Sequence, residues 1–121
     1  MAASIVQIPV WSLARARRVS VPTSLTSILT VPVVGDNLLV YVGGFLRILN
    51  ASTTVTVQVS WTDPDGGADS IAWYTSQTLS PGGYSLAVLP IAAAQGSTVQ
   101  IQAQSSVSGA ALLWADLLAS E

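Results

Sequence analysis

Residues 53–61 read TTVTVQVSW, and this stretch decides the fold class. Valine fills every second position up to Trp61, while threonine, glutamine and serine fill the positions between. Successive side chains of a β-strand point to opposite faces of its sheet, so the alternation predicts a strand with one buried and one solvated face. Residues 97–104, STVQIQAQ, repeat the pattern. Both segments are predicted to be strands of antiparallel sheets.

Two further segments are apolar at nearly every position: residues 38–49, LLVYVGGFLRIL, and residues 110–118, AALLWADLL. An antiparallel strand that is apolar on both faces has something covering each of them. We expect the domain's own core on one face and a neighbouring subunit on the other. The expected subunit contacts are Leu39, Tyr41, Phe45, Leu49, Leu112, Trp114 and Leu118.

A short helix is the alternative for residues 110–118, because alanine and leucine favour helices. A strand is the preferred interpretation, since the segment follows a predicted strand and the turn-forming pair Ser108-Gly109. Shorter strands are predicted over residues 5–10, 25–31, 71–78 and 84–89. Together these segments predict an all-β, antiparallel, jelly-roll-like β-sandwich of about eight strands.

The composition excludes several classes of catalytic and metal-binding site. The chain has 121 residues, the size of one domain, and contains neither cysteine nor histidine. Disulfides, thiol nucleophiles, histidine-based triads and Cys/His zinc sites are therefore excluded, and we expect no catalytic residues and no cofactor. The formal charge of -2 gives no reason to expect a nucleic-acid partner. No apolar run is long enough for a transmembrane helix, so no membrane partner is expected.

Hydrophobic residues make up 50% of the chain and charged residues 8%. That surplus of apolar side chains over charged ones is typical of a protein whose surface is partly buried against other copies. The composition therefore favours assembly over an isolated domain.

The acidic cluster of Asp63, Asp65 and Asp69 lies in the sequence WTDPDGGAD, residues 61–69. Closely spaced aspartates with a glycine can ligate calcium, but the loop pattern here lacks its terminal glutamate. The preferred interpretation is therefore a tight turn whose aspartates bond to nearby backbone N–H groups, with no metal site. A pair of glycosidase carboxylates is a further alternative that nothing in the sequence favours.

The basic residues fall mainly near the N-terminus. Residues 1–20 are predicted to form an extended arm that precedes a sandwich over residues 21–121, with Trp11, Arg15, Arg17 and Arg18 available for docking. Elsewhere, Arg47 stands alone in an apolar segment and would need a partner if buried. Asp116 on the other doubly apolar segment is the candidate.

The aromatic residues raise an alternative function. Trp73 and Tyr74 are adjacent, so in a strand they point to opposite faces and one of them would be exposed. An exposed aromatic ring could stack on a sugar, which would suit a carbohydrate-binding module. The more common fate of such residues is burial in the core or an interface.

The order of these segments resembles that of small bacteriophage virion proteins with a jelly-roll or TNF-like β-sandwich. The resemblance covers roughly residues 25–121 and is carried by LLVYV (38–42), NASTTVTVQVSWTD (50–63), PIAAAQGSTVQI (90–101) and LLASE (117–121). It implies a homotrimer in the virion that decorates a capsid or belongs to a fibre or tail. It also implies an N-terminal arm that docks on the major capsid protein or another virion protein.

Overall fold

The computed structural model describes residues 10–33 and 38–120, and within these ranges every regular element is a strand. The strands are β1 (Val10–Ser20), β2 (Thr26–Pro32), β3 (Leu38–Ile48), β4 (Thr53–Thr62), β5 (Ala68–Leu79), β6 (Gly82–Ala93), β7 (Thr98–Ser105) and β8 (Ala111–Ser120). The strands expected over residues 25–31, 71–78 and 84–89 are thus confirmed. The strand expected over residues 5–10 lies outside the described residues, except for its last residue, Val10. No helix in the described ranges is long and apolar enough to cross a membrane.

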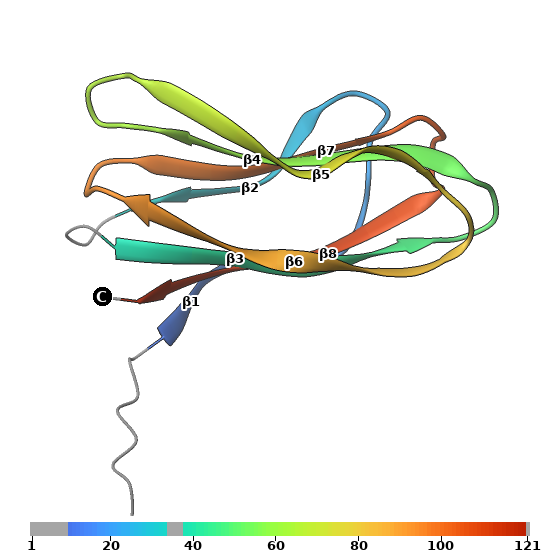
Figure 1. Cartoon of the computed structure of the whole chain (residues 1–121), viewed down its shortest axis with the longest axis horizontal. Helices are drawn as coiled ribbons and strands as arrows, with labels where there is room; N and C mark the ends of the chain where they lie inside the picture. Colours follow the sequence, from blue (N-terminus) through green and yellow to red (C-terminus); the bar gives the residue numbers. More distant parts are fainter. Residues whose placement is uncertain (1–9, 34–37, 121) are drawn as a thin grey trace, which may run out of the picture.

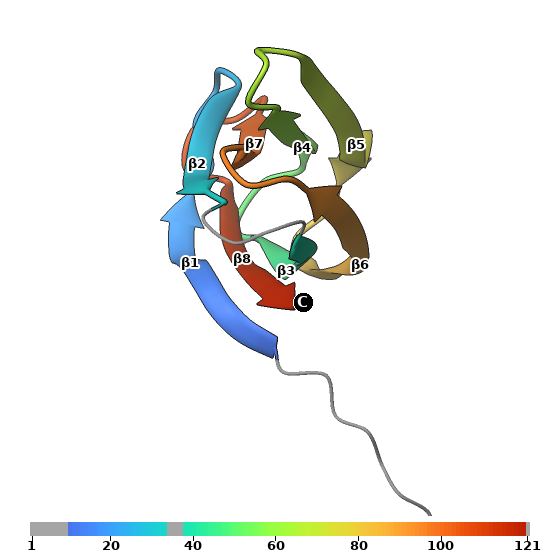
Figure 2. The same ribbon diagram turned by 90° about the vertical axis from the view of Figure 1, so that its left-hand side faces the viewer.

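Strands near the two ends of the chain pair with each other, and the pairing continues toward the middle of the sequence. The first pairs with the last (β1 with β8), and β2 pairs with β7, β3 with β6 and β4 with β5, all antiparallel. Two further pairings, β3 with β8 and β4 with β7, join these ribbons into sheet A (β1-β8-β3-β6) and sheet B (β2-β7-β4-β5). The two sheets lie face to face as layers (Figures 1 and 2). A long hairpin rolled up in this way is a jelly roll, which confirms the predicted fold class.

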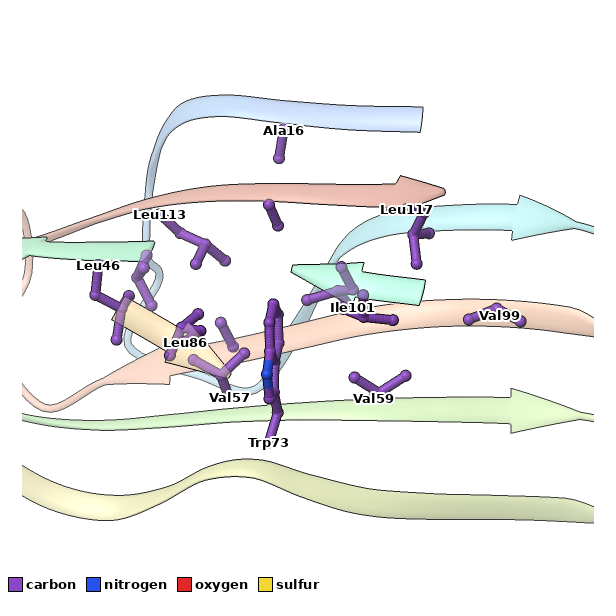
Figure 3. Close-up of a cluster of buried hydrophobic side chains, with 14 of the residues drawn as sticks. Ala16, Leu46, Val57, Val59, Trp73, Leu86, Val99, Ile101, Leu113 and Leu117 are labelled. Carbon is purple, nitrogen blue, oxygen red and sulfur yellow. The ribbon is translucent and has the colours of Figure 1, made fainter. Parts of the chain in front are cut away.

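The core lies between the sheets and follows from the period-two pattern. In β4, Val55, Val57 and Val59 are fully buried, and the threonine, glutamine and serine residues between them are half-buried on the outer face. The same alternation holds in β7, where Ile101 is fully buried. Side chains from sheet A, among them Leu113, meet these residues in one cluster (Figure 3).

Residues 110–118 form a strand, as preferred, and not a helix. β8 is hydrogen-bonded along both edges, to β1 on one side and to β3 on the other. A helix here would leave the facing backbone groups of both neighbours unpaired, so tertiary pairing outweighs the helix propensity of alanine and leucine.

The N-terminal segment differs from the expected arm, because Val10–Ser20 form the edge strand β1 of sheet A. The residues that contact the core change from even to odd positions along this segment. Ala14 and Ala16 contact the core first, followed by Val19 and by Val21, which comes directly after β1. A bulge between Ala16 and Val19 inserts one extra residue and restores the inward direction of the valines. Arg18, in this bulge, has a φ of 52°. The described sandwich therefore begins at residue 10 and not at residue 21.

A cluster of hydroxyl groups, two of them buried, ties the start of β4 to the end of β7 and the turn that follows it. Thr53 Oγ1 lies 2.6 Å from Ser105 Oγ and 3.1 Å from Ser106 Oγ, and it accepts a hydrogen bond of 3.1 Å from the Val107 N–H. Thr53 and Ser105 are fully buried. Because buried polar groups are stabilising only when they are paired, Thr53 is a point where the sandwich is sensitive to change.

We therefore predict that Thr53→Val lowers the free energy of unfolding by about 1–3 kcal/mol, since it removes the buried hydroxyl that bonds to Ser105 and accepts from the Val107 N–H. The control is Thr56→Val, which makes the same chemical change on the outer face of β4 and should change stability by less than about 0.5 kcal/mol. Urea denaturation of both variants measures the difference. Equal stabilities would contradict the role assigned to the cluster.

Candidate functional site: the outer face of sheet A

The two doubly apolar strands, β3 and β8, lie side by side in the middle of sheet A. Their inward residues close the core, as expected: Val40, Val42, Leu46, Leu113 and Leu117 are all fully buried. Of the seven expected contact residues, Phe45 is 38% exposed and four are half-buried on the outer face, namely Tyr41, Leu49, Trp114 and Leu118. Leu112 is only 8% exposed within the single chain, and the side chain of Leu39 lies outside the described residues.

An aromatic stack forms the centre of this outer face. Phe45 and Trp114 are register partners on β3 and β8, and their rings stack with centroids 4.5 Å apart and planes 10° apart. The Arg47 guanidinium lies 5.2 Å from the centroid of the Trp114 ring. Such contacts contribute about 0.5–1.5 kcal/mol for the stack and about 0.5–1 kcal/mol for an exposed cation–π pair. The stack is therefore held in one arrangement while part of it still faces solvent.

The expected pairing of Arg47 with Asp116 is wrong. Asp116 forms its ion pair with Arg15, with 3.2 Å between Arg15 Nε and Asp116 Oδ1, because β1 and β8 place these two residues opposite each other. Arg47 lies opposite Leu112, four residues away along β8. Arg15 and Asp116 are each about half exposed, so their pair adds little to stability.

A hollow of about 400 Å³ opens between the ion pair and the aromatic stack. Its lining comes from three strands: Arg15, Ala16 and Arg17 of β1, Gly44 and Phe45 of β3, and Trp114, Ala115 and Asp116 of β8. Arg17 has no ion-pair partner within residues 10–33 and 38–120. The hollow thus combines an aromatic wall with a cation that no described carboxylate neutralises.

The glycine pair in β3 shapes this surface. A Cβ built on Gly44 would lie 2.1 Å from the backbone oxygen of Trp114, so only glycine allows β8 to approach β3 here. At Gly43 a Cβ would make an ordinary contact, 3.7 Å from Val88 Cγ2. Val88, which is 64% exposed, therefore extends the apolar outer face on the side of β6. The sequence analysis missed Val88, although the paired glycines indicate a close approach of backbone at that position.

We predict that Gly44→Ala lowers the free energy of unfolding by about 2 kcal/mol or more, because the new methyl group forces two paired strands apart. Gly43→Ala is the matched control on the adjacent residue and should cost less than about 1 kcal/mol. Thermal denaturation of the two variants tests this. Equal losses at both positions would contradict the close approach of β8 to Gly44.

The outer face of sheet B has the opposite character. Its polar side chains bond to one another: Ser27 Oγ donates to Gln100 Oε1 at 2.8 Å, and Gln58 Nε2 donates to Gln102 Oε1 at 2.6 Å. Such a face is stable in water without a cover. Of the two outer faces, that of sheet A is the one whose chemistry favours a partner.

The three aspartates expected as a calcium alternative lie at the tip of the β4–β5 hairpin. Among the described residues, no three acidic side chains gather into a group that could hold a metal. Asp65 Oδ1 accepts a hydrogen bond of 3.1 Å from the Gly67 N–H, and Gly66 has a φ of 94°. This geometry agrees with the preferred interpretation, a tight turn with local side-chain bonds.

Trp73 and Tyr74 do not provide an exposed platform for a sugar. Trp73 is 9% exposed, its ring points into the core (Figure 3), and its Nε1–H donates to the carbonyl of Ala87 on the other sheet. Tyr74 is half-buried against the core, and its hydroxyl donates to Gln77 Oε1 at 3.1 Å. The carbohydrate-binding alternative therefore loses the residues on which it depended.

No protein-family model matches the sequence, and no curated protein matches it. Solved structures do match the fold. A structure of the Gx strain of infectious bursal disease virus aligns with a TM-score of 0.61 and 14% identity over 98% of this chain and 33% of that chain. The chain shares its fold with proteins of virus particles.

Two other structures agree with this result. A crystal structure of the same virus's particle aligns with a TM-score of 0.61 and 12% identity, over 95% of this chain and 31% of that one. The VP2 subviral particle aligns with a TM-score of 0.54 and 13% identity, over 93% and 32%. The chain spans about a third of the length of these proteins, and the likeness at this identity concerns the fold.

Proposed function

We propose that this chain is a non-enzymatic structural protein of a virion, in which copies of the chain associate through the outer face of sheet A. The observation that carries the proposal is the contrast between the two outer faces. Sheet A presents Phe45, Trp114 and Val88, whereas sheet B presents hydrogen-bonded glutamine, serine and threonine. Apolar side chains gathered on one face gain free energy when another surface removes them from water.

The fold is compatible with the virion role, and two further observations favour it over a carbohydrate-binding module. Jelly rolls occur in capsid proteins and also in lectins, so the fold by itself leaves both functions open. The solved structures described above are of a virus or its particles, and Trp73, one of the two residues proposed for a sugar platform, is buried. A virion location and self-association follow from this proposal.

The narrower features of the proposal come from the sequence resemblance. They are a bacteriophage virion, a homotrimer that decorates the capsid, and docking by an N-terminal arm. Since Val10–Ser20 belong to the sandwich, the arm in this proposal consists of residues 1–9. Arg17 and Arg18 are exposed on β1, and the side chain of Trp11 lies outside the described residues.

Self-association is the first prediction of this proposal. Purified protein should sediment as an oligomer, and Phe45→Glu should raise the apparent dissociation constant by roughly tenfold or more, because it removes the stacked aromatic ring and places a charge in the contact. Thr56→Glu introduces the same side chain on the outer face of sheet B and should leave the oligomer unchanged. Sedimentation velocity over a range of concentrations measures both. A well-folded wild-type monomer at every concentration would reject the proposal.

Incorporation into particles is the second prediction. Antibodies against the purified protein should label virus particles released by cells that carry its gene, in immunogold electron microscopy. Deletion of residues 1–9, which precede β1, should leave the melting temperature of the sandwich unchanged and abolish the labelling. If particles made with the wild-type protein are not labelled, the virion role is wrong. If particles made with the deletion variant are still labelled, only the docking role of residues 1–9 is wrong.

A further inference from the structure

Charge is separated between the two sheets. All four arginines lie on β1 and β3 of sheet A, whereas three of the four described aspartates, Asp63, Asp65 and Asp69, lie at the tip of the β4–β5 hairpin of sheet B. The fourth, Asp116, is already paired with Arg15. Among residues 10–33 and 38–120, Arg17, Arg18 and Arg47 of sheet A therefore have no carboxylate partner, and the aspartates of the hairpin tip have no cationic partner.

The hollow on sheet A has places for both a carboxylate and an apolar group. Arg17 lines it without an ion-pair partner in the described part of the chain, and Arg47 contacts the ring of Trp114. Phe45 forms an exposed apolar wall beside them. A suitable occupant has carboxylates that reach the arginines and apolar atoms that cover the ring.

The tip of the β4–β5 hairpin has this combination. Its aspartates lie beside two exposed apolar residues, Pro64 and Ile71, of which Ile71 is 44% exposed. Two backbone hydrogen bonds hold the turn: the Asp63 N–H donates to Gly67 O at 2.7 Å, and the Gly66 N–H donates to Asp63 O at 2.9 Å. A turn that is already ordered loses little conformational entropy when it binds.

Within one chain the tip cannot reach the hollow. The hairpin belongs to sheet B, which is the other layer of the sandwich (Figure 1). The residues that line the hollow all belong to sheet A, and Arg15, Arg17 and Phe45 among them are exposed. Stacked sheets are about 10 Å apart, so the hairpin tip and the outward side chains of sheet A are separated by at least the spacing between the layers. Any contact between them joins two molecules.

We infer that the hollow between Arg15, Arg17, Phe45 and Trp114 receives the β4–β5 hairpin tip of a second copy of this chain. This inference rests on the proposed self-association and specifies which two surfaces of neighbouring copies contact each other. Each copy contributes the hollow to one neighbour and the hairpin tip to another, which makes the interface heterologous. Such an interface closes into a ring when the rotation between copies permits. It also gives the three aspartates a role in assembly.

Charge exchange tests the contact. Arg17→Glu and Asp69→Arg should each raise the apparent dissociation constant of the oligomer by ~10-fold, because each places like charges against each other. The double variant Arg17→Glu/Asp69→Arg restores opposite charges and should return to nearly the wild-type value. Asp69 is exposed and makes none of the hydrogen bonds that hold the turn, so its replacement leaves the turn intact.

Arg18→Glu is the matched control, since it makes the same change of net charge at a residue that does not line the hollow. It should leave the dissociation constant unchanged. Sedimentation velocity at low and at high salt measures all variants, and added salt should weaken the wild-type contact. The inference is wrong if the double variant associates no more tightly than the single variant with the higher dissociation constant. It is also wrong if neither Arg17→Glu nor Asp69→Arg changes the dissociation constant of the oligomer, but the proposed function is unaffected by that result. A monomeric wild-type protein overturns both.

Discussion

The pairing of β8 between β1 and β3 is the interaction on which the rest of the structure depends. It joins the last strand to the first and so closes the rolled-up hairpin into a sandwich. Gly44 permits it, because any side chain there would collide with the backbone of β8. The same pairing places Leu113 in the core on one face and stacks Trp114 on Phe45 on the other. Core and candidate interface are thus two sides of one strand pair.

The sequence was sufficient to predict those parts of the fold that depend on local alternation. β4 and β7 keep strict period two, and the directions of their valines were predicted correctly. β1 was not predicted as a strand of the sandwich, because its bulge at Arg18 interrupts the alternation. The ion pair of Asp116 was assigned to the wrong arginine, since partners across strands depend on register, which no single segment specifies. The burial of Trp73 likewise depends on β6, where its hydrogen-bond acceptor lies.

The outer faces of the two sheets differ in the side chains that they present to solvent. Sheet B faces water with side chains that satisfy one another, so it needs no partner. Sheet A gathers aromatic rings and arginines around a hollow that the described residues of the chain do not fill. A low content of charged residues is compatible with solubility when the apolar face is covered by other copies.

Hydroxyl-radical footprinting with mass spectrometry tests most directly whether sheet A is covered in solution. We expect Phe45 and Trp114 to become protected as the protein concentration rises through the association range, while the exposed residues Leu25 and Val107, which lie outside sheet A, keep a constant rate of oxidation. Unchanged oxidation of Phe45 and Trp114 at every concentration would show that this face stays in contact with water. It would contradict the account of the molecule as a subunit of an assembly.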